Sequence, residues 1–102
     1  MAGGLMRFVS QDVWKDYAAT AGEVSAEVDI SKVEFLLIYL KVSAATDITL
    51  QVNTTDGFID YDTISFSAAG FNFWNIWSLA TDKVRFKTST ATTITIQVQM
   101  KT

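Results

Sequence analysis

The sequence predicts an all-β protein, a single-domain antiparallel β-sandwich of jelly-roll type with seven or eight strands. Three observations support this prediction. Segments in which apolar and polar side chains alternate follow one another along the chain, separated by turn residues at intervals of roughly 8–12 residues, as in sandwiches and barrels. A strand-turn-strand segment occurs twice. Threonine, valine and isoleucine, which suit pleated strands, dominate the alternating segments.

The repeat joins Lys41–Val52 to Lys87–Val98, 46 residues later, with eight of twelve positions identical. In each copy a strand runs into small, turn-compatible residues, and a second strand then alternates Ile, Leu or Val with Thr or Gln. This alternation places the apolar side chains on one face. We therefore expect each copy to form a hairpin or a tight strand-to-strand connection, with Ile48 and Ile94 on like faces.

Length and composition limit the class of protein. A chain of 102 residues fits one domain spanning 1–102, of which Met1–Gly4 is expected to be a flexible tail. A net charge of −3 argues against nucleic-acid binding, which requires a clustered basic surface. No signal peptide is expected, because no basic segment is followed by a long apolar run. The longest apolar run, Phe35–Leu40, is too short to cross a membrane.

The N-terminal third is the least regular part. Leu5–Val9 predicts a first strand. Gln11–Ala21 is compatible with a short helix capped by Asp12, and the alternative is an irregular strand and loop ending at Gly22. Glu23–Ile30 alternates and predicts a half-exposed strand with an acidic outer face. Its expected inward residues are Val24, Ala26, Val28 and Ile30.

The strand expected at Val33–Val42 is apolar on both faces. Such a strand is central in a sheet, or one of its faces meets a partner chain. Asp56-Gly57 is a strong turn signal, and the imperfect alternation after it predicts a bulge near Asp60–Asp62. Further strands are expected at 47–53, 58–66, 71–79, 83–88 and 92–100. The predicted core comprises Ile38, Leu40, Ile48, Leu50, Val84, Phe86, Ile94, Ile96 and Val98.

Few residues could support catalysis or metal binding. The sequence has no His, the commonest general base and metal ligand, and no Cys. Asp56, Asp60 and Asp62 could offer oxygen ligands to Ca²⁺, but their spacing is not that of an EF-hand, and solvated acids explain them better. No pair of carboxylates is placed for glycoside hydrolysis. We therefore expect no enzyme activity, no cofactor and no metal.

Two further clusters have alternative interpretations. Tyr61, Phe73, Trp74 and Trp77 could stack against sugar rings, whereas the simpler interpretation is a core or a subunit interface. The row Lys83, Arg85, Lys87 could bind an anion, whereas the simpler interpretation is a charged strand face that protects against edge pairing.

Four segments are informative when they are taken together: Tyr39–Thr46, Thr55–Gly57, Phe66–Gly70 and Phe73–Trp77. They resemble segments of small β-sandwich structural proteins of phages and archaeal viruses, such as capsid decoration and virion-surface proteins. Lys83–Lys87 also resembles a strand of galactose-binding-like jelly rolls. The resemblance covers about 33–102 and implies a non-enzymatic structural protein of the virion that assembles on itself or on a larger protein shell.

The sequence therefore indicates a structural protein that self-associates as a homodimer or homotrimer, and the viral resemblance favours the trimer. The alternative is a carbohydrate-binding β-sandwich module. The reason to expect self-association is apolar surface in excess of what one small core can bury. The expected interface residues are Phe35, Leu37, Tyr39, Phe71, Phe73, Trp74 and Trp77.

Overall fold

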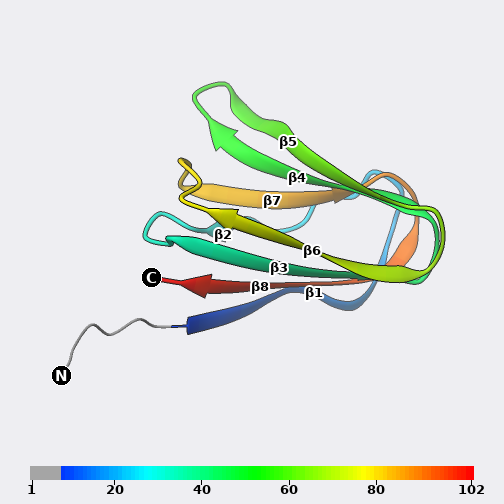
Figure 1. Cartoon of the computed structure of the whole chain (residues 1–102). Coiled ribbons are helices and arrows are strands. Elements are labelled where there is room, and N and C mark those ends of the chain that lie inside the picture. Colours follow the sequence, from blue (N-terminus) through cyan, green and yellow to red (C-terminus); the bar gives the residue numbers. More distant parts are fainter. Residues whose placement is uncertain (1–7) are drawn as a thin grey trace.

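The computed structural model describes residues 8–102 of the chain. This part contains eight strands (Figure 1). The expected tail at Met1–Gly4 and the first residues of the expected strand at Leu5–Val9 lie outside this range. The strands are β1 (Phe8–Ala19), β2 (Val28–Asp29), β3 (Phe35–Val42), β4 (Thr46–Thr54), β5 (Gly57–Phe66), β6 (Gly70–Trp77), β7 (Lys83–Thr88) and β8 (Thr92–Lys101).

The strands form two four-stranded antiparallel sheets, with the orders β1-β8-β3-β6 and β2-β7-β4-β5. We call them sheet A and sheet B. The pairs β1–β8, β2–β7, β3–β6 and β4–β5 describe one long ribbon doubled back at the β4–β5 turn. Wrapping this ribbon brings β3 beside β8 and β4 beside β7, which is the jelly-roll arrangement. The predicted fold class is confirmed.

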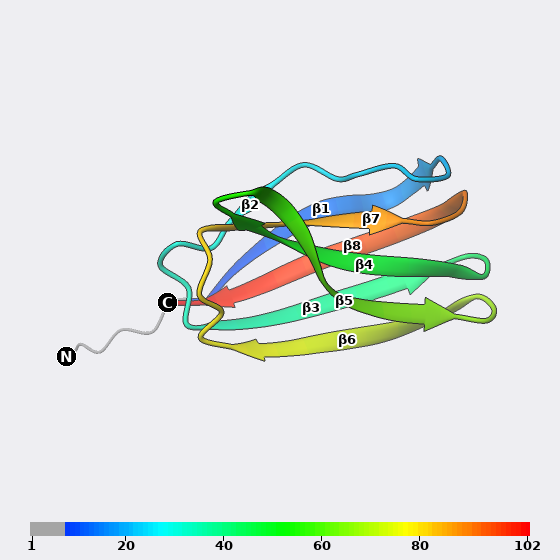
Figure 2. The same ribbon diagram turned by 90° about the horizontal axis from the view of Figure 1, so that it is seen from above.

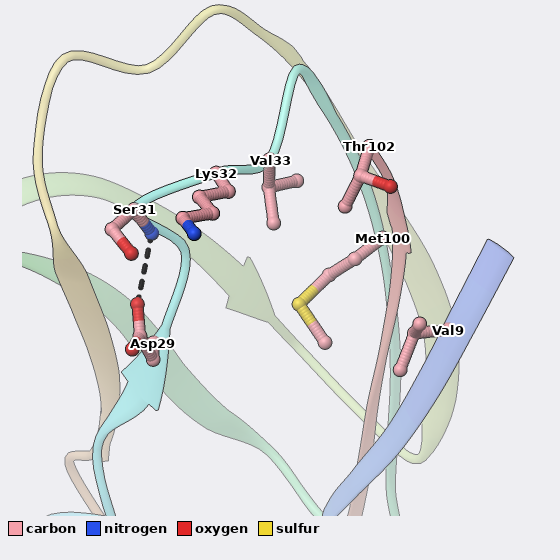
Figure 3. Close-up of a pocket in the computed structure, with 7 residues that line it drawn as sticks. All are labelled: Val9, Asp29, Ser31, Lys32, Val33, Met100 and Thr102. Carbon is pink, nitrogen blue, oxygen red and sulfur yellow. Dashed lines mark hydrogen bonds between the residues drawn. The ribbon is translucent and has the colours of Figure 1, made fainter. Parts of the chain in front are cut away.

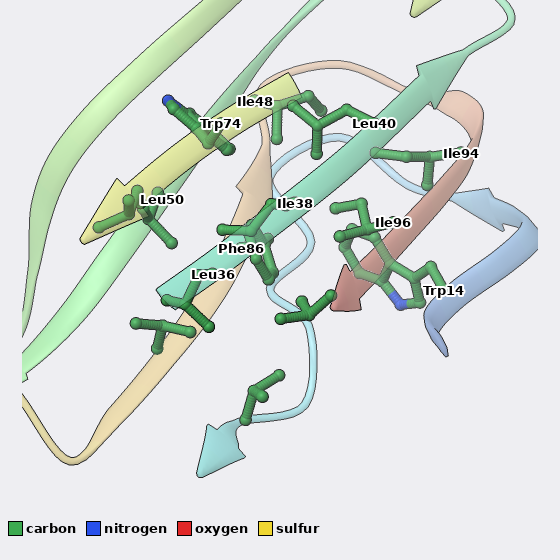
Figure 4. Packing of buried hydrophobic residues seen from close by; sticks show 14 of the residues in the cluster. Trp14, Leu36, Ile38, Leu40, Ile48, Leu50, Trp74, Phe86, Ile94 and Ile96 are labelled. Carbon is green, nitrogen blue, oxygen red and sulfur yellow. The ribbon is translucent and has the colours of Figure 1, made fainter. Parts of the chain in front are cut away.

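The core lies between the two sheets (Figure 4). All nine predicted core residues have no exposed surface, because they occupy the inward positions of β3, β4, β7 and β8. Trp14 from β1 and Trp74 from β6 complete the cluster near the two edges of sheet A, at 8% and 7% exposed.

The two repeat copies form equivalent connections that carry the chain from one sheet to the other, β3 to β4 and β7 to β8. The copies meet and bond to each other in matching pairs. The Ser43 N–H donates to the Thr93 carbonyl and the Ser89 N–H to the Asp47 carbonyl, both at 3.0 Å. Ile48 and Ile94 are both fully buried, as predicted.

The helix considered for Gln11–Ala21 is absent, and the alternative of an irregular strand is correct. This segment lies in β1, which pairs with β8 over its whole length. The register shifts twice, between Asp12 and Trp14 and between Trp14 and Tyr17, and Asp16 has a positive φ of 47°. Backbone pairing with a long neighbour satisfies groups that a short isolated helix would leave to solvent.

The strand expected at Glu23–Ile30 is shorter than predicted. Only Val28–Asp29 is a strand, with an isolated bridge at Val24. Val24 and Ala26 are exposed, and Ser25 is buried in their place. The Ser25 hydroxyl accepts a hydrogen bond from the Phe86 N–H at 2.9 Å, so a polar side chain takes an inward position that the apolar alternation assigned to its neighbours.

The bulge predicted near Asp60–Asp62 is present. Leu50 pairs with Asp62 and the next residue, Gln51, pairs with Asp60, so Tyr61 is the extra residue on β5. The β5 and β6 strands, the edges of sheets B and A, are joined by a short turn and lie along the same side of the sandwich (Figure 2).

Candidate interaction surface

An aromatic surface covers the β3–β6 half of sheet A on the side away from the core. The antiparallel register sets Phe35 opposite Trp77, and Tyr39 opposite Phe73, without any shift. Because alternate side chains of a strand point to opposite faces, the outward residues of both strands form one continuous layer. We call it the aromatic face and define it as Phe35, Leu37, Tyr39, Phe71, Phe73 and Trp77.

The rings of the aromatic face contact one another along its length. The Phe35 and Trp77 ring centroids are 4.4 Å apart, Tyr39 and Phe73 are 5.3 Å apart, and Phe71 and Phe73 meet edge to face at 6.1 Å. These separations are in the favourable range for aromatic pairs. Phe71 and Trp77 nevertheless remain 65% and 68% exposed, so the rings support one another while most of their surface faces solvent.

The other half of the same outer face is mainly polar, apart from Phe8, which is exposed at the start of β1. The outward residues of β8 include Thr95, Gln97 and Gln99. Gln97 donates to the Asp12 carboxylate on β1, and the Thr95 hydroxyl accepts from the Asp16 N–H. The aromatic face is therefore a bounded patch, and exposed apolar patches of this kind commonly mark interaction sites.

Trp74 is not part of this surface, and its predicted place at the interface is wrong. Its side chain points inward and packs against Phe86, with ring centroids 6.2 Å apart. Its indole N–H donates to the Asp62 carboxylate on β5 at 2.8 Å. The run Phe71–Trp77 is apolar in both phases of the alternation, so the sequence pattern does not separate Trp74 from its outward neighbours.

The four aromatic residues considered for sugar stacking do not form one platform. Trp74 is in the core and Tyr61 lies on β5 of sheet B. Of the four, only Phe73 and Trp77 belong to the aromatic face. The other rings of that face are those of Phe35, Tyr39 and Phe71, and Tyr61 and Trp74 are not among them. An open surface of rings is still present, although its members differ from those predicted.

The three aspartates considered for Ca²⁺ point to different places. Asp60 accepts from the Gln51 side-chain amide at 2.8 Å, Asp62 accepts from Trp74, and the Asp56 N–H donates to Thr54 within the turn. Within residues 8–102, no three acidic side chains gather in a way that could hold a metal ion. The Asp60 and Asp62 carboxylates act as hydrogen-bond acceptors for side chains of neighbouring strands, and Asp56 belongs to the turn.

The basic row on β7 is partly engaged. Lys83 lies 3.7 Å from Glu27. Arg85 donates from Nε to the Gln51 side-chain oxygen at 2.7 Å, and its guanidinium lies 4.2 Å from the Phe58 ring centre. Contacts of this kind stabilise a solvated strand face. The protection against edge pairing expected of the row is wrong, because β7 lies between β2 and β4 in sheet B.

An open hollow lies beside the end of β8, between β1 and the Asp29–Val33 turn (Figure 3). Val9, Val33 and Met100 supply an apolar lining, and Lys32 and Thr102 lie at its rim. The Ser31 N–H donates to Asp29, and this bond lowers the pKa of the Asp29 carboxyl. The polar groups bond within their own turn and do not converge on the hollow. No helix among the described residues is long and apolar enough to span a membrane.

The comparisons with known proteins define the class of fold. No known family matches this sequence, and no curated protein matches it. Among solved structures, the chain is similar to the SPBc2 prophage-derived protein YomS, with a TM-score of 0.75 and 14% identity over 100% of this chain and 99% of the other.

It is also similar to a chain of the Bacillus endospore appendages, described as a novel family of disulfide-linked pili. The TM-score is 0.63 and the identity 20%, covering 99% of this chain and 92% of that one. At these identities the similarity establishes a shared fold, that of a small all-β sandwich found in a phage-derived protein and in a pilus.

Proposed function

We propose that this protein is a non-enzymatic structural protein of a virion, of the capsid or virion-surface decoration type, which assembles with copies of itself. The observation that carries the proposal is the aromatic face. Six large apolar side chains cover half of one outer sheet surface, although the core between the sheets is complete without them. Burying such a surface against a partner is favourable by roughly 25 cal/mol per Å² of apolar area removed from water.

The structural neighbours support a role of this kind. One is derived from a prophage and the other belongs to a pilus, and both are compatible with a sandwich used as a building block. The pili are disulfide-linked, whereas these 102 residues contain no cysteine. Contacts between copies of this chain are therefore non-covalent in our proposal. A homodimer or homotrimer is expected, the trimer being favoured by the viral resemblance, and a larger protein shell is the second partner.

Light scattering at micromolar concentration tests the proposal. We expect the wild-type chain to exceed the 11.3 kDa of one copy, and Trp77→Ala or Tyr39→Asp to shift the mass toward a single chain. Ile59→Ala, an exposed apolar residue on β5, is the control and should leave the mass unchanged. A wild-type mass of one chain at every concentration would contradict self-association.

The alternative function is carbohydrate binding. Exposed rings of Phe71, Phe73 and Trp77 on an open sheet face favour it, because aromatic faces stack on the apolar faces of sugar rings. Titration with a panel of oligosaccharides, followed by tryptophan fluorescence, separates the two functions. A saturable change in emission that Trp77→Ala abolishes, from a chain that remains monomeric, would favour the alternative.

A further inference from the structure

The four edge strands of the sandwich differ in how well they resist pairing with another chain. Natural proteins protect open edges with bulges, charges, prolines or very short strands. The β2 edge has only two residues. The β1 edge has two register shifts and carries Asp12, Lys15 and Asp16. The β5 edge contains the Tyr61 bulge, with Asp60 and Asp62 on either side.

The β6 edge has none of these protections. It pairs with β3 over all eight residues, Gly70–Trp77, without a register shift. It contains no charged residue and no proline. Among the edges in residues 8–102 it is therefore the one regular, uncharged strand, and such a strand is a template for pairing with another β-strand.

The direction of the free backbone groups follows from two hydrogen bonds. The Ser78 N–H, one residue beyond β6, donates to the Glu34 carbonyl beside β3. The backbone N–H and C=O groups of successive residues in an antiparallel strand point to opposite sides of the strand. Because those of Ser78 point toward β3, the N–H and C=O groups of the even-numbered residues of β6 also point toward β3. The odd-numbered ones, Phe71, Phe73, Asn75 and Trp77, then face the open side.

The second hydrogen bond agrees with this assignment. The Phe73 N–H donates to the side-chain oxygen of its own neighbour, Asn72, at 2.8 Å. Asn72 is exposed, so this local bond can be exchanged for one to a partner strand. Three of the four residues with open backbone groups, Phe71, Phe73 and Trp77, also belong to the aromatic face, so one contact would satisfy the edge and cover adjoining rings together.

We propose that β6 pairs antiparallel with β6 of a second copy, which joins the two A sheets into one continuous eight-stranded sheet. This inference rests on the proposed self-association and specifies its geometry. A second copy suits this edge because an uncharged strand meets itself without opposing like charges. The other two long edges carry acidic residues, and in a chain with a net charge of −3 like charges placed opposite each other are destabilising.

The register centred on Trp74 is the one that pairs all four residues whose backbone groups face the open side. It sets Phe71 opposite Trp77 of the partner subunit and Phe73 opposite Asn75 of the partner subunit, so the two aromatic faces become one surface. Antiparallel pairing of a strand with itself requires a twofold axis and occupies the edge completely. The proposed contact therefore gives a dimer, in place of the trimer that the viral resemblance favours.

A proline substitution at the open edge tests the pairing. Asn75→Pro removes an N–H that faces the open side, and prolines are tolerated at such edge positions. We expect it to reduce the mass measured by light scattering from two chains to one, with an unchanged circular dichroism spectrum. Asn75→Ala changes the same side chain but keeps the N–H, and should remain dimeric.

Thr63→Pro on β5 is the matched backbone control. The Thr63 N–H, like that of Phe73, is bonded to the side chain of the preceding residue, here Asp62, on an exposed edge. This variant should remain dimeric. If Asn75→Pro is dimeric while folded, or if Thr63→Pro dissociates equally, pairing through β6 is overturned.

Engineered cysteines give a second measurement that does not depend on stability, since the chain has no cysteine of its own. Directly opposed residues in a hydrogen-bonded antiparallel pair have Cα atoms about 5.5 Å apart, which a disulfide can span. A mixture of Phe73→Cys and Asn75→Cys chains should form a disulfide-linked dimer under mild oxidation. Failure of the mixture to cross-link would overturn the proposed register.

The outcomes separate this inference from the function on which it rests. If the wild type is an oligomer that Trp77→Ala disrupts and Asn75→Pro does not, the copies meet face to face, self-association stands and the β6 pairing fails. If the wild type is monomeric at every concentration tested, both fail.

Discussion

Thr88 is fully buried although it carries a hydroxyl group. Its hydroxyl donates to the Thr90 carbonyl at 2.9 Å and therefore accepts from the Thr46 hydroxyl at 2.8 Å, while Thr46 also accepts from the Thr90 N–H. These bonds close a ring that holds the first repeat copy against the second. Val42 occupies the position equivalent to Thr88 in the first copy, and this is one of the four positions at which the two copies differ.

Replacing Thr88 with Val, its repeat counterpart, should lower the free energy of unfolding by about 1–3 kcal/mol, because the Thr90 carbonyl and the Thr46 hydroxyl each lose a partner. Thr93→Val is the control, since Thr93 is exposed on the outer face of β8. It should change stability by less than about 0.5 kcal/mol. Urea unfolding of both variants measures the difference, and equal losses would contradict a stabilising role for the ring.

Residue-scale prediction from the sequence succeeded where one phase of the alternation was clearly polar. In β8, Ile94 and Ile96 alternate with Thr and Gln, and only one assignment of the faces avoids burying polar groups. In Phe71–Trp77 the odd-numbered and the even-numbered residues are both largely apolar, so the alternation does not show which set faces the core. For this reason Trp74 was assigned to the interface although it is buried. A hydrogen bond from its indole to Asp62, fixed by the packing of two sheets, decides which tryptophan is buried.

At the scale of an element, one side chain ties the start of the loop between β1 and β2 to the end of β1. Glu23 accepts hydrogen bonds from the Tyr17 hydroxyl and from the Thr20 N–H and hydroxyl. These hydrogen bonds lower the pKa of the Glu23 carboxyl from its usual 4.5. The bond from the Tyr17 hydroxyl is the largest cause and the bond from the Thr20 N–H is the second. The loop therefore depends on the ionised form of this residue.

The pH dependence follows from the direction of that shift. The unfolded chain binds a proton at Glu23 at a higher pH than the folded chain does, so the stabilisation is complete above about pH 4.5 and is lost as the pH falls through the lower, folded value. In thermal unfolding from pH 7 to pH 3, the midpoint difference between wild type and Glu23→Gln should narrow as the pH decreases. Tyr17→Phe removes the largest cause of the shift and should weaken the dependence. A constant difference across this range would contradict the assignment.

The same loop shows why elements of the N-terminal third were harder to predict. The alternation at Glu23–Ile30 assigned Val24 and Ala26 to the core, but the chain runs along the edge of sheet B there and pairs with β7 at few positions. With few ladder partners, hydrogen bonding of Ser25 to the Phe86 backbone outweighs the apolar pattern. The irregular β1 strand likewise takes its form from β8.

On the scale of the whole molecule, the strand pairs are nested in the sequence. The first strand pairs with the last, the second with the seventh, the third with the sixth and the fourth with the fifth. Contacts so distant in sequence are formed at a large cost in loop-closure entropy, and all-β proteins of this type fold in roughly milliseconds to seconds. The chain has no proline, so proline isomerisation, which takes about 10–100 s, cannot add a slow phase.

Stopped-flow refolding at a concentration below that of self-association should therefore show one main phase in roughly the millisecond-to-second range. A phase of about 10–100 s that does not depend on protein concentration would contradict this expectation. A slow phase that accelerates with concentration would instead report association of folded chains.

The sandwich class, the strands from residue 35 onward and the inward residues of β3, β4, β7 and β8 could be predicted from the sequence, because period-two alternation, turn residues and an internal repeat are local patterns that one core can satisfy in few ways. Which sheet each strand joins, which edge is open and which side of the apolar β6 strand faces solvent emerge only in the folded arrangement. These properties depend on pairing between residues as far apart as Phe8 and Lys101, and no local pattern records such a pairing.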